Sequence, residues 1–513
     1  MTDEGRRERL EVVHLTSEYW PYAQTGGLAE AVRGLARHQA LNGQDVVVVL
    51  PLYGRVRDGP AELEPASPET TLPGRSDAPV RLWRAVGDRV EEGPEVLFVE
   101  HAPSFDRPGL YGDGTADYPD NARRFALFSR AALELLAARE AASPPAEAGA
   151  GGGDPPRILH VHDWHAAPAL LYLAAETDSR AADAARPARP PQATVLTVHN
   201  AGFQGSFPLE ALEELGLPPG RDLRGTLEWQ GRLNFLKAGL VLADATTTVS
   251  PTHADELRTE EGGFGLDPMF RELGDRMVGI LNGIDTTLWS PTSDPYFPRD
   301  YRYDARDLSG KRKARDRLRQ AAGLEADPDV PLCGLAARLA RQKGIDLLLS
   351  GRSFRDAPAQ FICLGSGDRS YEERLSALAR EGRVLVDTRF SERKEHELMA
   401  AADILLMPSL YEPCGLTQMR AQRYGTLPIG RRVGGLADTI VDGETGFLFD
   451  AFSPEALDAA IDRALGRFGD RVGWAEMMDR AMGRDFGWSG PAARYREVYR
   501  GALERIAGGS SLP

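Results

Sequence analysis

Three patterns are missing from this chain of 513 residues, and each absence excludes a class of protein. Only three cysteines occur, at Cys333, Cys363 and Cys414, without CxxC or CxxH spacing, so neither a disulfide framework nor a zinc knuckle is supported. The longest apolar run, VVVVLPL from Val46, is far shorter than the ~20 residues of a membrane span. Because MTDEGRRERLE also lacks the apolar core of a signal peptide, we expect a cytoplasmic protein with reduced thiols.

Positive charge is also scarce. The 61 Lys and Arg residues are outnumbered by 76 Asp and Glu residues, and no long Lys/Arg run occurs. A formal net charge of -15 argues against nucleic acids and anionic membranes as partners. Hydrophobic residues make up 42% of the chain, which is enough for globular cores, and the length predicts two or three domains.

The first part of the chain has the pattern of a parallel α/β domain. EVVHLTS and QDVVVVLP are typical of buried strands, and AEAVRGLARHQALNG between them has apolar residues at helical spacing. Further apolar strands are predicted at RILHVHD, ATVLTVHN and DATTTVS, each followed by turn or helix signals. This series predicts a parallel sheet covered on both faces, in a first domain of residues 1–290.

A second series of strands predicts a second doubly wound domain over residues 326–485. Its strands are expected within DVPLCGLAARL, QFICLGSG, RVLVDTR, DILLMPS, TLPIGRR and GFLFD. Residues 291–325, polar and rich in Pro and Asp, are expected to link the two domains, and residues 486–513 to form a helix that packs back on the first. SPPAEAGAGGGDPP and AADAARPARPPQ are predicted to be surface insertions.

Two domains of this kind imply a cleft, and ligands bind open α/β sheets where their strands end. Thr25, Gly26 and Gly27 follow the first strand, where glycines allow backbone N–H groups to approach an anion or a sugar hydroxyl. The ordinary alternative is a tight strand-to-helix turn. His199 also ends a predicted strand, and the alternative there is a histidine that bonds only to backbone.

The segment HVHDWH is the candidate for a metal site. His160 and His162 are expected on one face of a strand, with His165 in the following turn. A dinuclear hydrolase of the HxHxDH type needs its Asp at the fifth position, which here is Trp164, and no later cluster supplies further ligands. We therefore expect no metal, and a packed or substrate-facing role for these histidines.

Two motifs of the second domain suit a phosphorylated ligand. Arg338 and Lys343 follow a strand in RLARQKG, and two cations there could hold a diphosphate and neutralise a leaving nucleotide, unless the loop is simply a solvated charged one.

In YEPCGLTQMRAQRYGTLPIGRRVGGLADT, a loop with Glu412 is followed by a helix start that can present backbone donors to phosphate. Gly434 and Gly435 make a second turn of close approach, and Cys414 is expected to be structural rather than nucleophilic.

Taken together, these segments resemble the bacterial glycogen synthase and plant starch synthase family. SEYWPYAQTGGLAEAV, HVHDWHAAPAL, TVHNAGFQGSFP, GILNGIDTTLWSP and RLARQKGIDLL occur in that family's order, and the run from Glu412 to Thr439 is long and specific. The resemblance implies a GT-B fold of two Rossmann-like domains facing a central cleft. It also implies ADP-glucose as the donor and the nonreducing end of an α-1,4-glucan as the acceptor, with the acceptor side on the first domain and the donor held by the second.

The resemblance also implies roles for single residues. Arg338 and Lys343 match the basic pair that grips the donor diphosphate, Glu412 matches the glutamate that holds hydroxyls of the transferred glucose, and His199 matches a histidine that lines the glucose site. The remaining matches are polar or donor-contacting positions at Asp163, Asn282, Cys414, Gly415, Leu416, Thr417, Gly434, Gly435, Thr25, Gly26 and Gly27.

The implied reaction retains the anomeric configuration and needs no metal or other cofactor. No motif nominates the carboxylate nucleophile that a double displacement would need. The resemblance instead implies front-face substitution, in which the leaving phosphate oxygen takes the acceptor's proton while the domains close and exclude water.

One position departs from the family. The residue before TGG is typically a lysine near the donor's phosphates and glucose, whereas here it is Gln24. This leaves open a related transferase with another donor, such as UDP-glucose, or another acceptor, and also a weakened glucan-binding homologue. A metal-dependent hydrolase is the alternative from another class, and it depends on HVHDWH alone.

Overall fold

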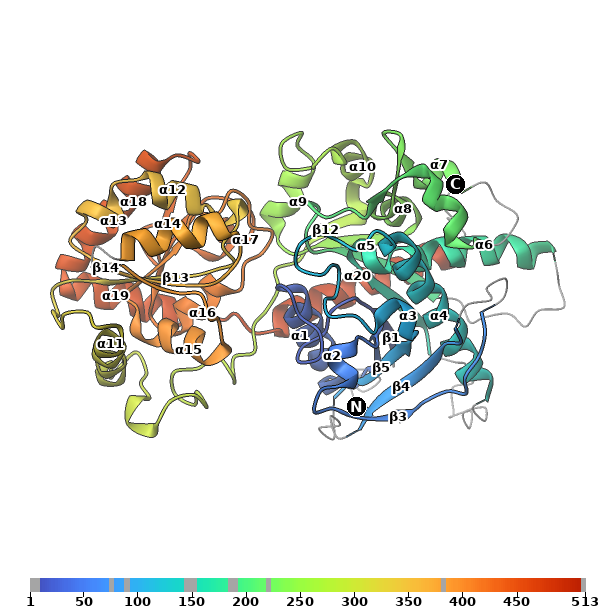
Figure 1. Ribbon diagram of the computed structural model, residues 1–513, viewed down its shortest axis with the longest axis horizontal. Coiled ribbons are helices and arrows are strands. Elements are labelled where there is room, and N and C mark those ends of the chain that lie inside the picture. The colour runs from blue at the N-terminus through green and yellow to red at the C-terminus, as the bar shows by residue number, and fades with distance from the viewer. Residues whose placement is uncertain are drawn as a thin grey trace, which may run out of the picture. The chain divides into compact units, whose positions relative to one another are not determined.

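The structure, a computed structural model, describes residues 10–72, 78–86, 93–142, 155–182, 192–217, 223–379 and 384–508. The chain divides into two compact units (Figure 1). Unit 1 comprises Met1–Val249, Ala254–Ile280 and Trp488–Pro513, and unit 2 comprises Ser250–His253 and Leu281–Gly487. Most of the two expected insertions, residues 143–154 and 183–191, lies outside the described residues.

Unit 1 contains a nine-stranded sheet with the order β12-β11-β7-β6-β1-β2-β5-β4-β3. The strands from β12 to β5 are parallel, as the buried apolar segments predict, whereas β4 and β3 are antiparallel additions that the sequence analysis does not anticipate. The strands are β1 Glu11–Leu15, β2 Asp45–Pro51, β3 Glu62–Pro65, β4 Arg81–Val86, β5 Glu95–Glu100, β6 Arg157–His162, β7 Gln192–Val198, β11 Ala245–Thr248 and β12 Met277–Gly279.

Helices cover both faces of this sheet. Val12 and Val13, which point to opposite faces of β1, belong to two separate buried clusters, and the cluster around Val12 includes Tyr495 and Tyr499 of the last helix. The longer helices of unit 1 are α1 Leu28–Leu41, α4 Asn121–Ala142, α6 Pro168–Ala182, α8 Phe235–Leu242 and α20 Ser489–Ala507.

Shorter elements complete unit 1. An antiparallel sheet of three short strands has the order β8-β10-β9, and the boundary between the two units falls within helix α9. These elements are α2 Gly54–Arg57, α3 Ala102–Phe105, α5 Asp163–Ala166, β8 Ser206–Phe207, η1 Leu209–Leu215, α7 Arg224–Leu227, β9 Glu228–Trp229, β10 Arg232–Asn234, α9 Pro251–Leu257, α10 Asp267–Glu272 and η2 Gly274–Arg276.

Unit 2 contains a six-stranded, fully parallel sheet with the order β15-β14-β13-β16-β17-β18. Its strands are β13 Leu332–Ala336, β14 Gln360–Leu364, β15 Val384–Asp387, β16 Ile404–Met407, β17 Leu427–Arg431 and β18 Phe447–Phe449. Each lies within one of the six segments from which the sequence predicts a strand.

The helices of unit 2 come before, between and after these strands. They are η3 Arg299–Tyr301, α11 Ser309–Ala322, η4 Arg341–Lys343, α12 Ile345–Ser350, α13 Ser353–Asp356, α14 Arg369–Ala379, α15 Glu392–Ala401, α16 Thr417–Arg423, α17 Gly434–Thr439, α18 Pro454–Gly469 and α19 Arg471–Met482.

The segment 291–325, expected as a linker, is part of unit 2 and includes helix α11. Lys311 of α11 is buried, and its Nζ donates to the carbonyl oxygens of Ala400 at 3.1 Å, Ala402 at 2.7 Å and Tyr424 at 3.0 Å. Burial lowers the pKa of Lys311 to about 7. The polar composition that suggests a linker therefore includes a lysine that bonds to the ends of two helices, α15 and α16.

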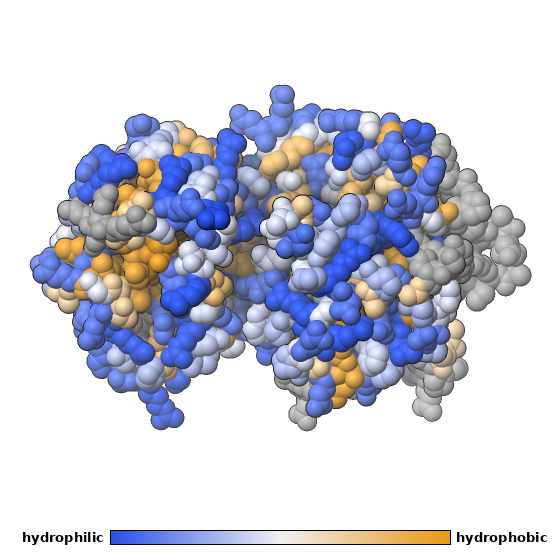
Figure 2. Space-filling view, in the orientation of Figure 1, coloured by the Kyte–Doolittle hydropathy of each residue, from blue (hydrophilic) through white to orange (hydrophobic). Residues whose placement is uncertain are grey.

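Most residues on the face of the molecule shown in Figure 2 are hydrophilic, because the apolar cores are buried. The large apolar side chains that are exposed come from separate segments: Leu41, Val86, Phe203, Phe390, Val441 and Val472. No helix among the described residues combines the length and the apolar character that crossing a membrane requires.

Helix α20 is fitted closely to unit 1, and this predicts the effect of a small substitution. A Cβ at Gly34 of α1 would lie 2.1 Å from Nε1 of the buried Trp488, which precedes α20. We expect Gly34→Ala to displace Trp488 and to destabilise unit 1 by about 1–3 kcal/mol, as overpacked cores are. The midpoint of urea unfolding, monitored by proteolysis at α20, measures this loss of stability.

The matched control is Gly490→Ala within α20, where an added Cβ meets nothing within 4 Å. It should leave the unfolding midpoint unchanged or raise it slightly, because alanine favours the helix. Equal midpoints for Gly34→Ala and the wild type would contradict the close fit.

Candidate active site

The turn that contains Thr25 and Gly26 is held by a buried carboxylate. Glu18, which follows β1, accepts hydrogen bonds from the Thr25 N–H at 2.7 Å, the Thr25 hydroxyl at 2.6 Å and the Gly26 N–H at 3.3 Å. The Tyr111 hydroxyl donates to the same carboxylate at 2.7 Å. These loop amides therefore face the carboxylate of Glu18, which belongs to the chain itself. The glycine pattern alone does not predict this contact.

Gln24 points back toward its own helix. Its Nε2 donates to Oε1 of Glu30 at 3.0 Å and to the Gly26 carbonyl oxygen at 3.4 Å. The four residues Gln24–Gly27 are exposed, and a Cβ added at Gly26 would meet nothing within 4 Å. The turn is thus open to an approaching molecule at the position that departs from the family.

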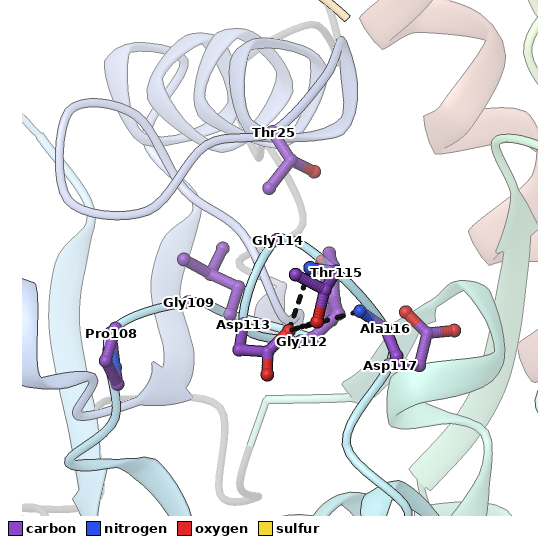
Figure 3. Close-up of a pocket in the computed structure, with 11 residues that line it drawn as sticks. Thr25, Pro108, Gly109, Gly112, Asp113, Gly114, Thr115, Ala116 and Asp117 are labelled. Atoms are coloured by element: carbon purple, nitrogen blue, oxygen red, sulfur yellow. Dashed lines mark hydrogen bonds between the residues drawn. The ribbon is translucent and has the colours of Figure 1, made fainter. Parts of the chain in front are cut away.

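Thr25 also lines a pocket together with residues 108–117 (Figure 3). Within that loop, Oδ1 of Asp113 accepts hydrogen bonds from the Thr115 N–H at 2.8 Å and the Ala116 N–H at 3.1 Å. These bonds fix a compact turn beside Thr25, and Tyr111 ties the same loop to Glu18. None of the sequence motifs described above includes this loop.

Asp163 and His199 lie side by side at the ends of β6 and β7. Oδ1 of Asp163 accepts the backbone N–H of His199 at 2.7 Å and, less closely, that of Asn200 at 3.4 Å. Asp163 has a left-handed backbone with φ of 55°, a conformation that Asp tolerates better than most residues. Burial raises the pKa of Asp163 to about 7 and lowers that of His199 to about 3.

The histidines of HVHDWH are all buried. Among the described residues, His14, His160 and His162 form a group whose ring nitrogens lie within 4.8 Å of one another. Both ring nitrogens of each are within hydrogen-bond distance of a neighbouring side chain. His165 is stacked between Trp164 and Tyr111, with ring centroids 3.9 Å and 4.6 Å away.

In unit 2, the basic loop after β13 meets the loop after β16. Nζ of Lys343 lies 2.6 Å from Oε2 of Glu412, and the Ser409 hydroxyl donates to the same oxygen at 2.9 Å. Glu412 is 6% exposed, whereas Arg338 is exposed and makes a long bond of 3.4 Å to Gln342. The structure therefore brings Lys343 and Glu412 together and leaves the guanidinium of Arg338 accessible.

The loops around Glu412 are so close that only glycine fits at three positions. A Cβ would lie 1.8 Å from the Pro408 carbonyl oxygen at Gly344, 2.0 Å from that of Glu412 at Gly434, and 2.0 Å from that of Cys414 at Gly435. Gly344 and Gly434 also have positive φ, of 68° and 40°. The second glycine turn thus packs directly on the loop that carries Glu412.

The start of α16 follows that loop. Gly415 has a φ of 70°, and among the described residues the N–H groups of Gly415, Leu416 and Thr417 donate to no partner. The Cys414 thiol is buried and contacts Asn282, and burial raises its pKa to about 12. A thiol with such a pKa is not a nucleophile at neutral pH, which supports a structural role.

Both halves of the chain match known protein families. A protein family described as starch synthase catalytic domain matches residues 11–272, and one described as glycosyl transferases group 1 matches residues 316–471. A glycogen synthase of Anaeromyxobacter dehalogenans is 43% identical over 96% of this chain and 99% of its own length. Glycogen synthase 2 of Geobacter sulfurreducens is 38% identical over 97% of this chain and 100% of its own.

The chain belongs to the glycogen and starch synthase family. Its fold also matches the catalytic domain of starch synthase IV from Arabidopsis thaliana, a structure bound to ADP and acarbose. The TM-score is 0.83 at 30% identity, over 97% of this chain and 100% of that one. The protein is thus a glycosyltransferase with two α/β units of the GT-B fold, and the resemblance inferred from its motifs is confirmed.

Arg420 lies in helix α16, eight residues after Glu412. Its Nη1 lies 2.9 Å from Oε1 of Glu395, and both side chains are buried. The guanidinium also lies over the Trp289 ring, 4.2 Å from its centroid. Arg420 is thus part of the buried interior of unit 2.

Glu18 and Ser409 escape the sequence analysis although both lie beside the motifs. Glu18 is in SEYWPY just before TGG, and Ser409 is three residues before Glu412. A carboxylate directly after a buried strand and before a glycine turn is a signal that could identify Glu18. Ser409 resembles any loop serine, and only its 2.9 Å bond to Glu412 distinguishes it.

The raised pKa of Asp163 predicts a pH-dependent gain in stability for Asp163→Asn. The unfolded state has the ordinary pKa of 3.8 and the folded state one of about 7. The contribution of the neutral Asp163 side chain to the free energy of unfolding is fully present below pH 4. It is lost as the pH rises through 7. Because Asn has no charge to lose, the variant should gain up to about 3 kcal/mol relative to the wild type between pH 4.5 and 8.5.

Urea unfolding at several pH values measures this difference. Asp113→Asn is the control, because the Thr115 hydroxyl lowers the pKa of the exposed Asp113 to about 2, below the tested range. Its difference from the wild type should therefore stay constant between pH 4.5 and 8.5. A constant difference for Asp163→Asn as well would show that Asp163 is already charged in the folded protein.

Proposed function

We propose that this protein transfers glucose from ADP-glucose to the nonreducing end of an α-1,4-glucan, with retention of configuration. Family membership supports a nucleotide-sugar donor and a glucan acceptor. The related starch synthase IV structure, which is bound to ADP and acarbose, supports the same pairing of ligands.

The observation that carries the proposal is the meeting of Lys343 with Glu412 at 2.6 Å, next to the accessible Arg338. Two cations in the loop between β13 and α12 can neutralise the charge that develops on ADP as it leaves. Both the Lys343 and the Ser409 bonds use Oε2 of Glu412. The other oxygen, Oε1, is then the acceptor for hydroxyls of the transferred glucose.

Other residues of unit 2 complete the donor side. The N–H groups of Gly415, Leu416 and Thr417 are proposed to donate to donor phosphate oxygens, as helix starts commonly do. Gly434 and Gly435 hold the Glu412 loop at backbone contact distance, and Asn282 holds Cys414. These four positions shape the donor site through the loop that they support.

In unit 1, Asp163 and His199 are proposed to face the sugar. Asp163 fixes the backbone of His199 at 2.7 Å, and His199 presents a neutral ring. The amides of Thr25 and Gly26 already donate to Glu18, so they are not available to bind an anion of the ligand. The turn would instead contact the ligand through its exposed surface and the amide of Gly27. The open space above Gly26 is where a ligand could approach closely.

The proposed chemistry is substitution on one face of the sugar. The bond from glucose C1 to the donor phosphate oxygen breaks as the acceptor's 4-hydroxyl oxygen bonds to C1, and the hydroxyl proton passes to that phosphate oxygen. No metal or other cofactor takes part in this scheme. The unpaired, buried state of Cys333, Cys363 and Cys414 supports the cytoplasmic location expected from the sequence.

Removing either cation should slow transfer strongly. We expect Arg338→Ala and Lys343→Ala each to lower kcat/KM for ADP-glucose by about 10²–10³-fold, the usual cost of losing one donor to developing charge. Incorporation of radiolabelled glucose into glycogen, with and without a chelator, measures this. Arg341→Ala is the matched control, because Arg341 is an exposed cation in the same turn. Absence of transfer by the wild type from both ADP-glucose and UDP-glucose would refute the proposed function.

The departure at Gln24 predicts a weakened donor interaction that a lysine would restore. A hydrogen bond to a charged group contributes ~1.5–3 kcal/mol, so Gln24→Lys should lower the KM for the preferred donor roughly tenfold to hundredfold. Initial rates with ADP-glucose and UDP-glucose also show whether donor preference changes. Gln24→Met, which is of similar length without a charge, should not improve the KM; an equal improvement would rule out the charge as the cause.

A further inference from the structure

Four histidines of unit 1 lie where three adjacent strands end. His14 is in β1, His160 and His162 are in β6, and His199 directly follows β7. In the sheet β1 pairs with β6 and β6 with β7, and His14 is directly opposite His160 in the register. His14, His160 and His162 are at most 1% exposed, so water does not meet the hydrogen-bonding needs of their rings.

Hydrogen bonds connect His199 through two of these rings to Gln39 of helix α1. Nε2 of His199 lies 3.0 Å from Nδ1 of His162, and Nε2 of His162 lies 3.0 Å from Nδ1 of His14. Nε2 of His14 lies 2.8 Å from Oε1 of Gln39. The Gln39 Nε2 group then donates to the Tyr499 hydroxyl of α20 at 2.9 Å.

Tyr499 joins the fourth histidine to the same network. Its hydroxyl lies 2.8 Å from Nδ1 of His160, and Nε2 of His160 lies 2.6 Å from the Thr197 hydroxyl. Gln39 and Tyr499 are 3% and 1% exposed. The network therefore runs without solvent from the last helix of the chain to the histidine at the end of β7.

All of these rings are neutral at ordinary pH. Burial lowers the pKa of His14 to about 4 and that of His199 to about 3, and it lowers those of His160 and His162 well below 6.5. A neutral imidazole has one N–H donor and one acceptor nitrogen. In a chain of such rings, the direction of one hydrogen bond therefore determines the direction of every other.

Gln39 sets that direction, because its Oε1 can only accept. His14 then donates from Nε2 and accepts at Nδ1, so His162 donates from Nε2 and accepts at Nδ1. His199 must in turn donate from Nε2. Its Nδ1 keeps a lone pair, which can accept a hydrogen bond from a hydroxyl group.

We propose that Gln39 and Tyr499 are positioning residues for glucose transfer, which hold His199, through His14 and His162, in the tautomer protonated at Nε2. In this arrangement Nδ1 of His199 accepts a hydrogen bond from a hydroxyl of the transferred sugar. The inference depends on the proposed function only for that last contact. The tautomer itself is a property of the free protein.

Nitrogen NMR of the full-length protein with labelled histidine rings tests the tautomer directly. The chain has nine histidines, and the spectrum of His199→Gln assigns the His199 signals. We expect wild-type His199 to be protonated at Nε2. Gln39→Met, which keeps the side chain's length but removes the amide, should give a mixture of tautomers, and so should Tyr499→Phe. Gln39→Glu should keep the wild-type tautomer when the new side chain is ionised, because a carboxylate can only accept from His14.

Kinetics of the same variants test the positioning role. Loss of one neutral hydrogen bond to the sugar predicts about a threefold to tenfold lower kcat for Gln39→Met, with little change in donor KM, and recovery in Gln39→Glu. Thr246→Val is the matched control, since Thr246 is buried in β11 and its hydroxyl has no partner among the described residues. It should change neither the tautomer nor kcat.

Each remaining outcome overturns the proposal. His199 protonated at Nδ1 in the wild type, or an unchanged tautomer in either Gln39→Met or Tyr499→Phe, refutes the relay. A changed tautomer with unchanged kcat refutes the positioning role. If the wild type transfers no glucose, the proposed function fails, while the NMR result still decides whether Gln39 controls His199.

Discussion

Backbone contact between loops is the constraint on which the rest of unit 2 depends. The carbonyl oxygens of Pro408, Glu412 and Cys414 occupy the space that side chains would need at Gly344, Gly434 and Gly435. Loops that touch at this distance cannot shift independently. Lys343 on one loop and Glu412 on another are therefore held in fixed relative positions. The 2.6 Å ion pair between them is a result of this packing as much as a cause of it.

In unit 1, by contrast, polar side chains are buried where the strands end. Glu18 receives donors from Thr25, Gly26 and Tyr111, Asp163 receives the amides of two consecutive residues, and the histidines satisfy one another. Since unpaired buried polar groups are costly, each of these groups restricts its neighbours to one arrangement. The result is a rigid edge of the sheet beneath the exposed TGG turn.

Much of this architecture is predictable from the sequence because buried parallel strands leave a strong local signal. Apolar runs locate the strands of unit 2, and the glycines of VGGLADT indicate close approach. Strands β3 and β4 lack such runs, and α11 resembles a linker because few of its residues are buried. Glu18 clamps a turn seven residues away, whereas Gln39 and Tyr499 meet across 460 positions of the chain, a distance that no local pattern spans.

Helix α20 has a consequence for how the protein is made. It follows unit 2 in the chain, yet Tyr495, Tyr499 and Ala502 are buried in unit 1. During translation unit 2 is therefore complete before unit 1 has its last helix, and unit 1 emerges from the ribosome with part of one face of its sheet uncovered. An incomplete sheet of this kind exposes apolar surface. The synthesis of α20 thus supplies the apolar side chains that cover this part of the sheet.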